Sequence, residues 1–350
     1  MSMAAMTAVV LGASGMLGGA ICRRLIEDGH KVVGVSRRKP REPLPIPYLS
    51  IDLLDPADCR AKAAELSDVT HIFYAGRAPH GEGGNESVED NLAMLVNAVE
   101  AVSAAAPGLR HVNLMHGTKY YGNHLGPYKT PAEEDDPRPG VPNFYYDQQD
   151  WISALDVPWS WSVVRPPLVF DFTPGKPRNL VSVVAAYAEI MRELGRPFSF
   201  PGTEVAYDCL AECALASHVA RAAVWMAGEP AAANQAFNIT NGDIFRWSTL
   251  WPRFAAYFGL EVGPPLGISL AETMPAHAPV WDHIVAKHDI APTPYSDIAL
   301  WDYGDYVFAP TYDIIADTTK ARRAGFHDVV KSDRMFTDLF DRYRAARLIP

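Results

Sequence analysis

The chain has 350 residues, of which 48% are hydrophobic, and a formal net charge of −10 at pH 7. The acidic balance argues against a nucleic-acid partner, because such a partner calls for a basic face. No apolar run reaches the roughly 18 residues that span a bilayer, so no membrane segment is expected. Because the start runs into a glycine motif without a basic flank, we expect no secretory signal and a cytoplasmic protein.

The four cysteines, Cys22, Cys59, Cys209 and Cys213, do not have the spacing of a disulfide framework or a metal site. Cys209 and Cys213 are four residues apart, but no histidine or second cysteine pair completes a zinc set. We therefore expect reduced, mostly buried thiols and no bound metal.

The first half of the chain alternates short apolar runs with amphipathic stretches. This pattern predicts strands at 7–12, 31–36, 70–75 and 111–115 and helices at 16–29 and 86–106. A polar, proline-rich loop follows over roughly 116–142, and a loop of that length is usually functional or disordered. A further strand is predicted at 159–166 and a helix at 179–195.

Such alternation predicts an α/β fold, a Rossmann-type doubly wound parallel sheet with helices on both faces. We assign residues 1–172 and 208–242 to this nucleotide-binding domain. The remainder, residues 173–207 and 243–350, is more irregular and rich in Trp, Tyr and Pro, and is predicted to form a smaller mixed substrate-binding lobe.

Three glycines, Gly12, Gly15 and Gly18, give the pattern G-x-x-G-x-x-G between the first predicted strand and the first predicted helix. Glycines permit the tight turn and let backbone N–H groups approach a pyrophosphate at the helix N-terminus. The strand–turn–helix context favours a dinucleotide site over a merely structural turn.

The residues directly after the second predicted strand distinguish an NAD site from an NADP site. An NAD site usually has an acidic residue there, which accepts from the ribose 2′-hydroxyl. This chain has Ser36, Arg37, Arg38 and Lys39, which suit a 2′-phosphate, although a basic run can also be a solvated turn. The basic run makes NADPH the expected cofactor, and Asp52 could bind the adenine amine.

Enzymes that move hydride from a nicotinamide often use a tyrosine with a lysine four residues later on a helix. In VPNFYYDQQD (141–150) the corresponding positions are Gln149 and Asp150, and no tyrosine of the chain has such a lysine. A tyrosine with a pKa of about 10 still needs a nearby cation. Lys119, in HGTKYYG after the predicted strand at 111–115, lies by topology at the carboxyl edge of the sheet and could supply this cation.

The motifs GTKYYG, EEDDPR, NFYYDQQD, WSVVRP, FNITNGDIFRW and PVWDHIV, with the terminal LIP, resemble the progesterone 5β-reductase/iridoid synthase-like (PRISE) family. These are extended short-chain dehydrogenases/reductases, and the resemblance covers nearly the whole chain. It implies NADPH-dependent reduction of activated C=C bonds in enones or enals. It also implies that Tyr145 and Lys119 are the catalytic residues, whereas Tyr146 is expected to pack against the fold.

The residue patterns and this resemblance together predict the residues of the site. Tyr145 stabilises the enolate oxygen, and Lys119 binds ribose and lowers the pKa of Tyr145. The predicted cofactor-binding residues are Gly12, Ser14, Gly15, Met16, Leu17, Ser36, Arg37, Arg38, Asp52, Leu53, Ala75, Gly76, Lys119, Tyr145, Pro166 and Val169. The predicted substrate-binding residues are Arg77, His116, Phe144, Asn179 and Tyr207, with Tyr74, Phe172 and Trp301 as further candidates.

Departures from plant members of the family leave the substrate open. Arg77 stands where they have a tryptophan, His116 replaces a small hydroxyl residue, and PGKPRN (174–179) is basic where they are more apolar. Arg77 could contact cofactor phosphates or an anionic substrate, or lie in an exposed loop. A steroid or iridoid precursor is therefore not assumed.

Three other functions stay open. The same tyrosine and lysine would serve a carbonyl reductase acting by 1,2-reduction. A non-catalytic NADP(H) sensor would need the glycines and arginines but neither catalytic residue. A sugar-nucleotide epimerase is disfavoured, since that class uses the helical tyrosine–lysine pair. The expected partner is a small carbonyl compound, and the sequence leaves a homodimer open.

Overall fold

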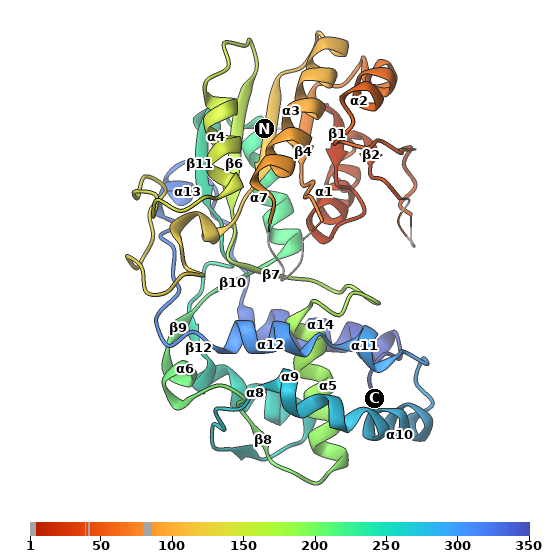
Figure 1. The fold of residues 1–350 in the computed structure, drawn as a ribbon, viewed down its shortest axis with the longest axis vertical. Helices are drawn as coiled ribbons and strands as arrows, with labels where there is room; N and C mark the ends of the chain where they lie inside the picture. The colour runs from red at the N-terminus through yellow and green to blue at the C-terminus, as the bar shows by residue number, and fades with distance from the viewer. Residues whose placement is uncertain (1–4, 39, 41–42, 80–85) are drawn as a thin grey trace.

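The computed structural model describes residues 5–38, 40, 43–79 and 86–350. Within them, seven strands form one parallel sheet in the order β11-β6-β5-β4-β1-β2-β3 (Figure 1). The strands are β1 (Thr7–Leu11), β2 (Lys31–Val35), β3 (Tyr48–Leu49), β4 (His71–Tyr74), β5 (His111–Met115), β6 (Ser160–Arg165) and β11 (Gln235–Asn238). The order runs outward from β1 in both directions, so the doubly wound prediction is confirmed and the crevice lies beyond the carboxyl ends of β1 and β4.

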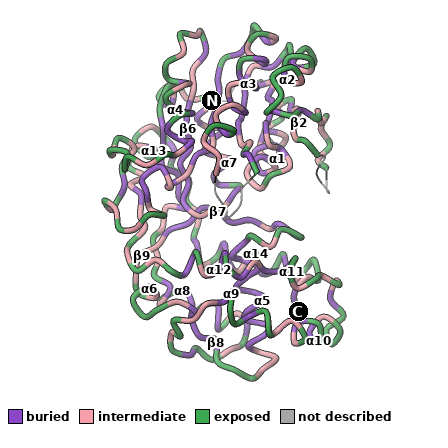
Figure 2. Tube along the Cα trace, viewed as in Figure 1, coloured by how far each residue is buried: buried purple, intermediate pink, exposed green. Residues whose placement is uncertain are grey.

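Helices cover both faces because successive residues of the central strands point to opposite sides. Val9 and Leu11 of β1 pack on one side, and Ala8 and Val10 pack on the other. The first side holds α2 (Pro56–Ala63), α3 (Val88–Ala105) and α4 (Phe144–Ser153), and the second holds α1 (Met16–Glu27), α7 (Ala216–Gly228) and α13 (Thr319–Arg323). Exposed residues gather on the outer loops and helix turns (Figure 2).

A second, largely helical body lies below the sheet domain in Figure 1. Its centre is α5 (Leu180–Glu193), in which every residue from Leu180 to Met191 is buried, as expected of a helix that is apolar on most of its surface. The longer helices around it are α8 (Trp247–Phe258), α10 (Ala278–His288), α12 (Trp301–Phe308) and α14 (Ser332–Ala345).

The remaining elements are short and are distributed over the sheet domain and the lobe. They are η1 (Ala64–Leu66), η3 (Thr118–Tyr121), β7 (Leu168–Phe170), β8 (Phe198–Ser199), α6 (Glu204–Asp208), β9 (Leu210–Ala211), β10 (Cys213–Leu215), η4 (Pro230–Ala232), β12 (Phe245–Arg246), β13 (Val262–Gly263), α9 (Leu270–Thr273), η5 (Met274–His277) and α11 (Tyr295–Ile298). β10 pairs with β7 and β13 with β8 in parallel, whereas β12 pairs with β9 antiparallel.

One segment late in the chain returns to the sheet domain. Ala321 of α13 and Phe326 pack in the same core cluster as β1 and α7. The predicted domain limits gave all of 243–350 to the lobe, and those limits stay a prediction. This return brings residues 312–317 beside the long loop after β5, where Ala132 N–H donates to Ile315 O at 2.9 Å.

Cys22, Cys59 and Cys213 are buried and Cys209 is half-buried, and all four are free thiols. Over the described ranges, no cluster of His, Cys, Asp or Glu could hold a metal ion. None of the helices in those ranges has the length and apolar character needed to cross a bilayer.

Candidate active site

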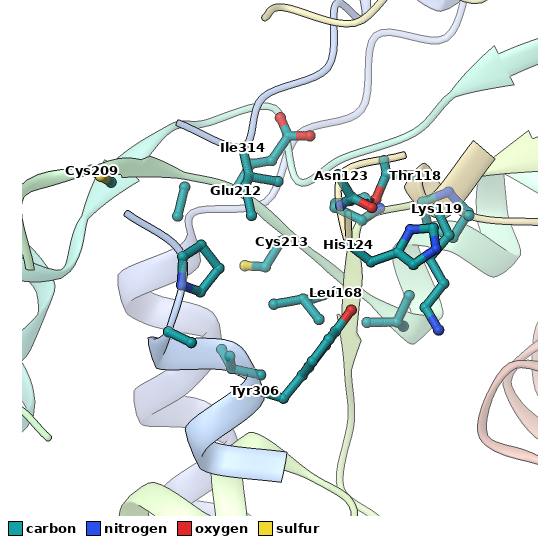
Figure 3. Close-up of a pocket in the computed structure, with 18 of the residues that line it drawn as sticks. Thr118, Lys119, Asn123, His124, Leu168, Cys209, Glu212, Cys213, Tyr306 and Ile314 are labelled. Atoms are coloured by element: carbon teal, nitrogen blue, oxygen red, sulfur yellow. Dashed lines mark hydrogen bonds between the residues drawn. The ribbon is translucent and has the colours of Figure 1, made fainter. Parts of the chain in front are cut away.

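A cavity of about 570 Å³ lies between the carboxyl edge of the sheet and the helical lobe. Its lining includes Leu17 from the start of α1, the loop after β5, the segment 166–170 and α12. In Figure 3, Tyr306 extends from α12 into this cavity, with Lys119 and His124 on the opposite side. The cavity therefore joins the glycine turn to the segment that carries Lys119.

Lys119 reaches the cavity from η3, directly after β5. Its Nζ lies 3.4 Å from Oε2 of Glu86, and its side chain is 32% exposed. Burial lowers the pKa of Lys119, and the nearby cations Arg77 and Arg178 lower it further. The ammonium is thus held at the mouth of the crevice among other cationic groups.

Asn143 fixes Lys119 and Tyr145 relative to each other. It caps α4, and its Oδ1 accepts a hydrogen bond from Tyr145 N–H at 3.0 Å. Its Nδ2 donates to the carbonyl oxygen of Lys119, also at 3.0 Å. Sequence reasoning missed this residue, although an asparagine directly before a helix is a typical N-cap.

Tyr145 is buried, and its ring stacks on His116 with centroids 4.6 Å apart. Its hydroxyl lies beside the backbone of Gly117, where a Cβ would come within 3.4 Å of it. Burial raises the pKa of Tyr145, and the Arg77 guanidinium opposes this rise. The hydroxyl is therefore protonated at neutral pH. The opposing cation in the structure is Arg77, and the pKa-lowering role of Lys119 stays a prediction.

The neighbouring tyrosine has a structural role, as predicted. Tyr146 is buried, and its hydroxyl donates to the carbonyl oxygen of Tyr120 at 2.7 Å. The Cζ of Arg138 lies 4.8 Å from the centre of its ring. Tyr146 thus anchors α4 to η3.

Gln149 occupies the position that a helical lysine would take after Tyr145. Its Oε1 accepts a hydrogen bond at 2.8 Å from the Nη2 of Arg165, a residue with no exposed surface. Arg165 also donates to Tyr121 Oη and to Glu134 O, both at 2.9 Å. A lysine at position 149 would place two cations together in a buried site, which is costly. The buried arginine accounts for the absence of the helical lysine.

The glycine turn has the shape of a phosphate-binding turn. Gly12 has φ +85°, and a Cβ there would lie 2.6 Å from Ala75 O, while a Cβ on Gly18 would collide with Gly12 O. Gly15 caps α1 without a side-chain hydrogen bond, and the first turn has no acidic residue. Free N–H groups and the helix dipole therefore suit an anion at this end of α1.

The basic run after β2 is exposed at its described positions. Ser36 Oγ donates to Arg38 O at 2.7 Å, and Arg37 O accepts from Ser50 Oγ at 3.2 Å. Neither Arg37 nor Arg38 forms an ion pair within the described part of the chain. Lys39 lies outside the described residues. Asp52 is exposed across the same edge, where its Oδ1 accepts from Leu54 N–H at 3.1 Å.

Comparison with known proteins shows the family. The family model of a PRISE-like Rossmann-fold domain matches residues 50–350. The chain belongs to the PRISE family. The (S)-8-oxocitronellyl enol synthase of Catharanthus roseus is 34% identical, with 98% of this chain and 92% of that protein covered. The 3-oxo-Delta(4,5)-steroid 5-beta-reductase of Arabidopsis thaliana is 33% identical over 98% of this chain and 93% of its own length.

Solved structures show the fold alone. A UDP-N-acetylglucosamine 4-epimerase from Bacillus cereus aligns with a TM-score of 0.68 at 13% identity and covers 99% of each chain. A UDP-glucose 4-epimerase from Thermotoga maritima aligns with a TM-score of 0.66 at 16% identity, over 97% of this chain and 99% of that one. PRISE membership marks the chain as an oxidoreductase, built on the extended short-chain dehydrogenase/reductase fold.

The structure brings together part of the predicted site of this PRISE protein. The cavity lining includes Leu17, Arg77, His116, Lys119, Tyr145, Pro166 and Val169. Ala75 N–H donates to Leu11 O at 2.9 Å, which holds Ala75 and Gly76 beside the glycine turn. Leu53 is buried, and its carbonyl oxygen accepts from Asn97 Nδ2 at 3.0 Å.

Three predicted substrate-binding residues do not line the cavity. Asn179 is buried as the N-cap of α5, and its Nδ2 donates to Asp171 O at 2.6 Å and Thr173 Oγ1 at 2.8 Å. Phe144 packs against Tyr145 with ring centroids 4.4 Å apart, and Tyr207 packs against Phe200 at 5.0 Å. The further candidates Tyr74, Phe172 and Trp301 are also outside the lining.

The cavity has lining residues that sequence reasoning missed. Tyr303 and Tyr306, three residues apart on α12, present stacked rings to it. Arg178 lies in the basic segment before α5. The spacing of the two tyrosines was the available signal, but side chains three apart on a helix share a face whether that face meets a core or a ligand.

Glu212, between β9 and β10, gives a prediction about stability. It is 4% exposed, its Oε1 accepts from Ala316 N–H at 3.0 Å, and burial raises its pKa to about 8. Above the unfolded pKa the folded state binds the extra proton, so stability falls as pH rises toward 8. Glu212→Gln keeps the acceptor without the charge. We expect its stability advantage over the wild type to grow by roughly 2–4 kcal/mol from pH 5 to pH 8.

Urea unfolding of both proteins at the two pH values measures this difference. Glu261→Gln, at an exposed position in the lobe, is the control and is expected to behave like the wild type at both. A stability difference between Glu212→Gln and the wild type that does not change with pH would contradict the account.

Proposed function

We propose that the protein is an NADPH-dependent reductase of α,β-unsaturated carbonyl compounds, acting by 1,4-reduction. The observation that carries the proposal is the buried, protonated Tyr145 hydroxyl in one cavity with Lys119, joined to the glycine turn through Leu17. The related enol synthase and steroid 5-beta-reductase support this reading. A cytoplasmic location and a homodimer stay predictions.

The described residues fit the cofactor. Gly12 leaves room for a backbone approach, the first turn of α1 offers uncapped N–H groups, and Arg37 and Arg38 are exposed beside it. When bound, the reduced nicotinamide would supply a hydride to the β-carbon of the substrate. Lys119 would hold the ribose hydroxyls by charge-assisted hydrogen bonds.

Tyr145 has its role at the carbonyl oxygen of the substrate. As hydride adds to the β-carbon, the electron pair of the C=C bond moves and negative charge develops on that oxygen. A neutral hydroxyl aimed at the oxygen stabilises this charge in a site with little water. A proton from solvent then adds to the α-carbon and gives the saturated carbonyl. A raised pKa suits this role, because the hydroxyl donates a hydrogen bond and stays protonated.

Product analysis separates the proposal from 1,2-reduction. The protein is incubated with NADPH and 2-cyclohexen-1-one, and the product is identified by mass spectrometry and NMR. We expect cyclohexanone. Formation of 2-cyclohexen-1-ol would assign a carbonyl reductase instead, and tight NADPH binding without turnover of any enone would favour the sensor.

The basic run after β2 gives a prediction about cofactor choice. Replacing both Arg37 and Arg38 by alanine removes two candidate partners of a 2′-phosphate. We expect the KM for NADPH to rise about tenfold to a hundredfold, because hydrogen bonds to a charged group are strong. The KM for NADH is expected to change little. Steady-state kinetics with both cofactors measure this, and equal effects on both would contradict the assignment to NADPH.

A further inference from the structure

One wall of the cavity is cationic. Arg77 comes from the segment after β4, Lys119 from η3 after β5, and Arg178 from the segment before α5, and all three line the cavity. Arg77 and Lys119 share Glu86 as an ion-pair partner, and both guanidinium groups lower the pKa of Lys119. Three separate segments thus bring positive charge to the same place.

Among the residues that the structure describes, few carboxylates balance this wall. Glu86 pairs with Arg77 and, at 3.4 Å, with Lys119. Glu212 is the carboxylic acid in the described lining, and burial raises its pKa to about 8, which favours its neutral form at pH 7. Of the cations, Arg178 forms no ion pair with any carboxylate in the described ranges. Over the described residues, the wall therefore has a net positive charge.

Arg178 is held in place by an aromatic ring instead of an anion. Its Cζ lies 4.7 Å from the ring centre of Tyr303, within the range of a cation–π contact. Arg178 is exposed, and a guanidinium can bind a carboxylate through two parallel hydrogen bonds. Tyr303 is buried, which limits the movement of the pair.

The rest of the cavity is largely apolar. Leu168, Phe170, Trp247 and Val307 contribute to its surface. A hydrophobic ligand body fits this lining, and an anionic end fits the cationic wall. A wholly neutral ligand would leave the unpaired guanidinium without a partner after water is displaced, which costs binding energy.

We propose that the substrate is an α,β-unsaturated carbonyl compound with a carboxylate group, and that Arg178 binds this carboxylate. The proposal rests on the proposed function and adds the substrate class. Arg77 adds to the positive field while it is paired with Glu86. The carboxylate is distinct from the reacting carbonyl, which Tyr145 binds.

A matched pair of probes tests the proposal with the full-length protein and NADPH. The anion (E)-8-oxonon-6-enoate and its methyl ester share one enone and differ in charge. We expect kcat/KM to be about 10-fold to 100-fold higher for the anion in the wild type. Arg178→Met is expected to remove this preference, chiefly by lowering kcat/KM for the anion. Arg178→Lys is expected to keep part of the preference for the anion, because lysine retains the positive charge. Arg196→Met, at an exposed arginine elsewhere in the lobe, is the control and is expected to keep the full preference.

A binding experiment separates this proposal from the proposed function. Calorimetric titration of the NADP⁺ complex with nonanoate and nonanamide needs no turnover. Tighter binding of nonanoate, lost in Arg178→Met, would support the carboxylate site even if no enone is reduced. Equal binding of the two, or equal kcat/KM for acid and ester, would overturn it. A weaker affinity of Arg178→Met for NADP⁺ itself would also overturn it, by assigning Arg178 to the cofactor.

Discussion

Tyr145→Phe is expected to lower kcat for enone reduction by about 10²–10³-fold, the typical loss for one oxyanion donor. The phenyl ring keeps the stacking on His116, whose centroid lies 4.6 Å away, so the cavity keeps its shape. NADPH affinity is expected to change by less than about tenfold, because a single neutral hydrogen bond at most is lost. Steady-state rates with 2-cyclohexen-1-one and fluorescence titration of NADPH measure the two effects.

Tyr146→Phe is the matched control for this experiment. It removes the hydroxyl that donates to Tyr120 O at 2.7 Å and leaves the cavity lining intact. We expect a loss of about 1 kcal/mol in the free energy of unfolding and nearly unchanged kcat. If Tyr146→Phe lost activity and Tyr145→Phe kept it, the assignment of the two tyrosines would be reversed.

The second large effect is expected for Lys119→Met. This change removes the ammonium and retains an unbranched apolar side chain. The Kd for NADPH is expected to rise about tenfold to a hundredfold, because charge-assisted hydrogen bonds to the ribose are lost. We also expect kcat at saturating NADPH to fall about tenfold or more, since the ribose is no longer held in place. Binding titrations and rates at saturating cofactor separate these two effects.

Lys129→Met is the control for Lys119→Met. Lys129 lies in the same loop after β5, its side chain is 53% exposed, and it pairs with Glu133 and Asp136. We expect NADPH binding and kcat close to those of the wild type. Wild-type behaviour of Lys119→Met as well would show that Lys119 only pairs with Glu86.

The sheet domain could be predicted closely from sequence because its signals are local. The runs at 111–115 and 159–166 became β5 (His111–Met115) and β6 (Ser160–Arg165), and the glycine pattern lies between β1 and α1. Buried parallel strands are continuous apolar runs, and such runs stand out next to amphipathic helices. The order of the sheet then followed from general rules of doubly wound folds.

The cavity wall contributed by the lobe could not be predicted in the same way. Asn179 and Tyr207 have residue types common in binding sites, but Asn179 caps α5 and Tyr207 packs on Phe200. Arg178 and Tyr306 face the cavity because α5 and α12 pack together through contacts distant in sequence. An isolated sequence does not encode such distances in any local pattern.

The placement of Lys119 beside Tyr145 could be predicted only in part. Topology brought Lys119 to the carboxyl edge of the sheet, but it did not show what holds η3 to α4. The answer is Asn143, whose amide caps the helix and binds the carbonyl oxygen of Lys119 at 3.0 Å. Gln149 and Arg165 account for the missing helical lysine. Gln149 accepts a hydrogen bond from the buried Arg165 at 2.8 Å, and a lysine at position 149 would place a second cation there.

The measurement that tests the account most directly compares Tyr145→Phe, Lys119→Met and the double variant at saturating NADPH and 2-cyclohexen-1-one. If the two residues act as one unit on the bound substrate, the double variant has a kcat close to that of the slower single variant. If they act independently, the two losses multiply. Multiplied losses are the result that we expect, because Tyr145 acts at the carbonyl oxygen of the substrate and Lys119 acts at the ribose. A double variant whose kcat equals that of the slower single variant would contradict these separate roles.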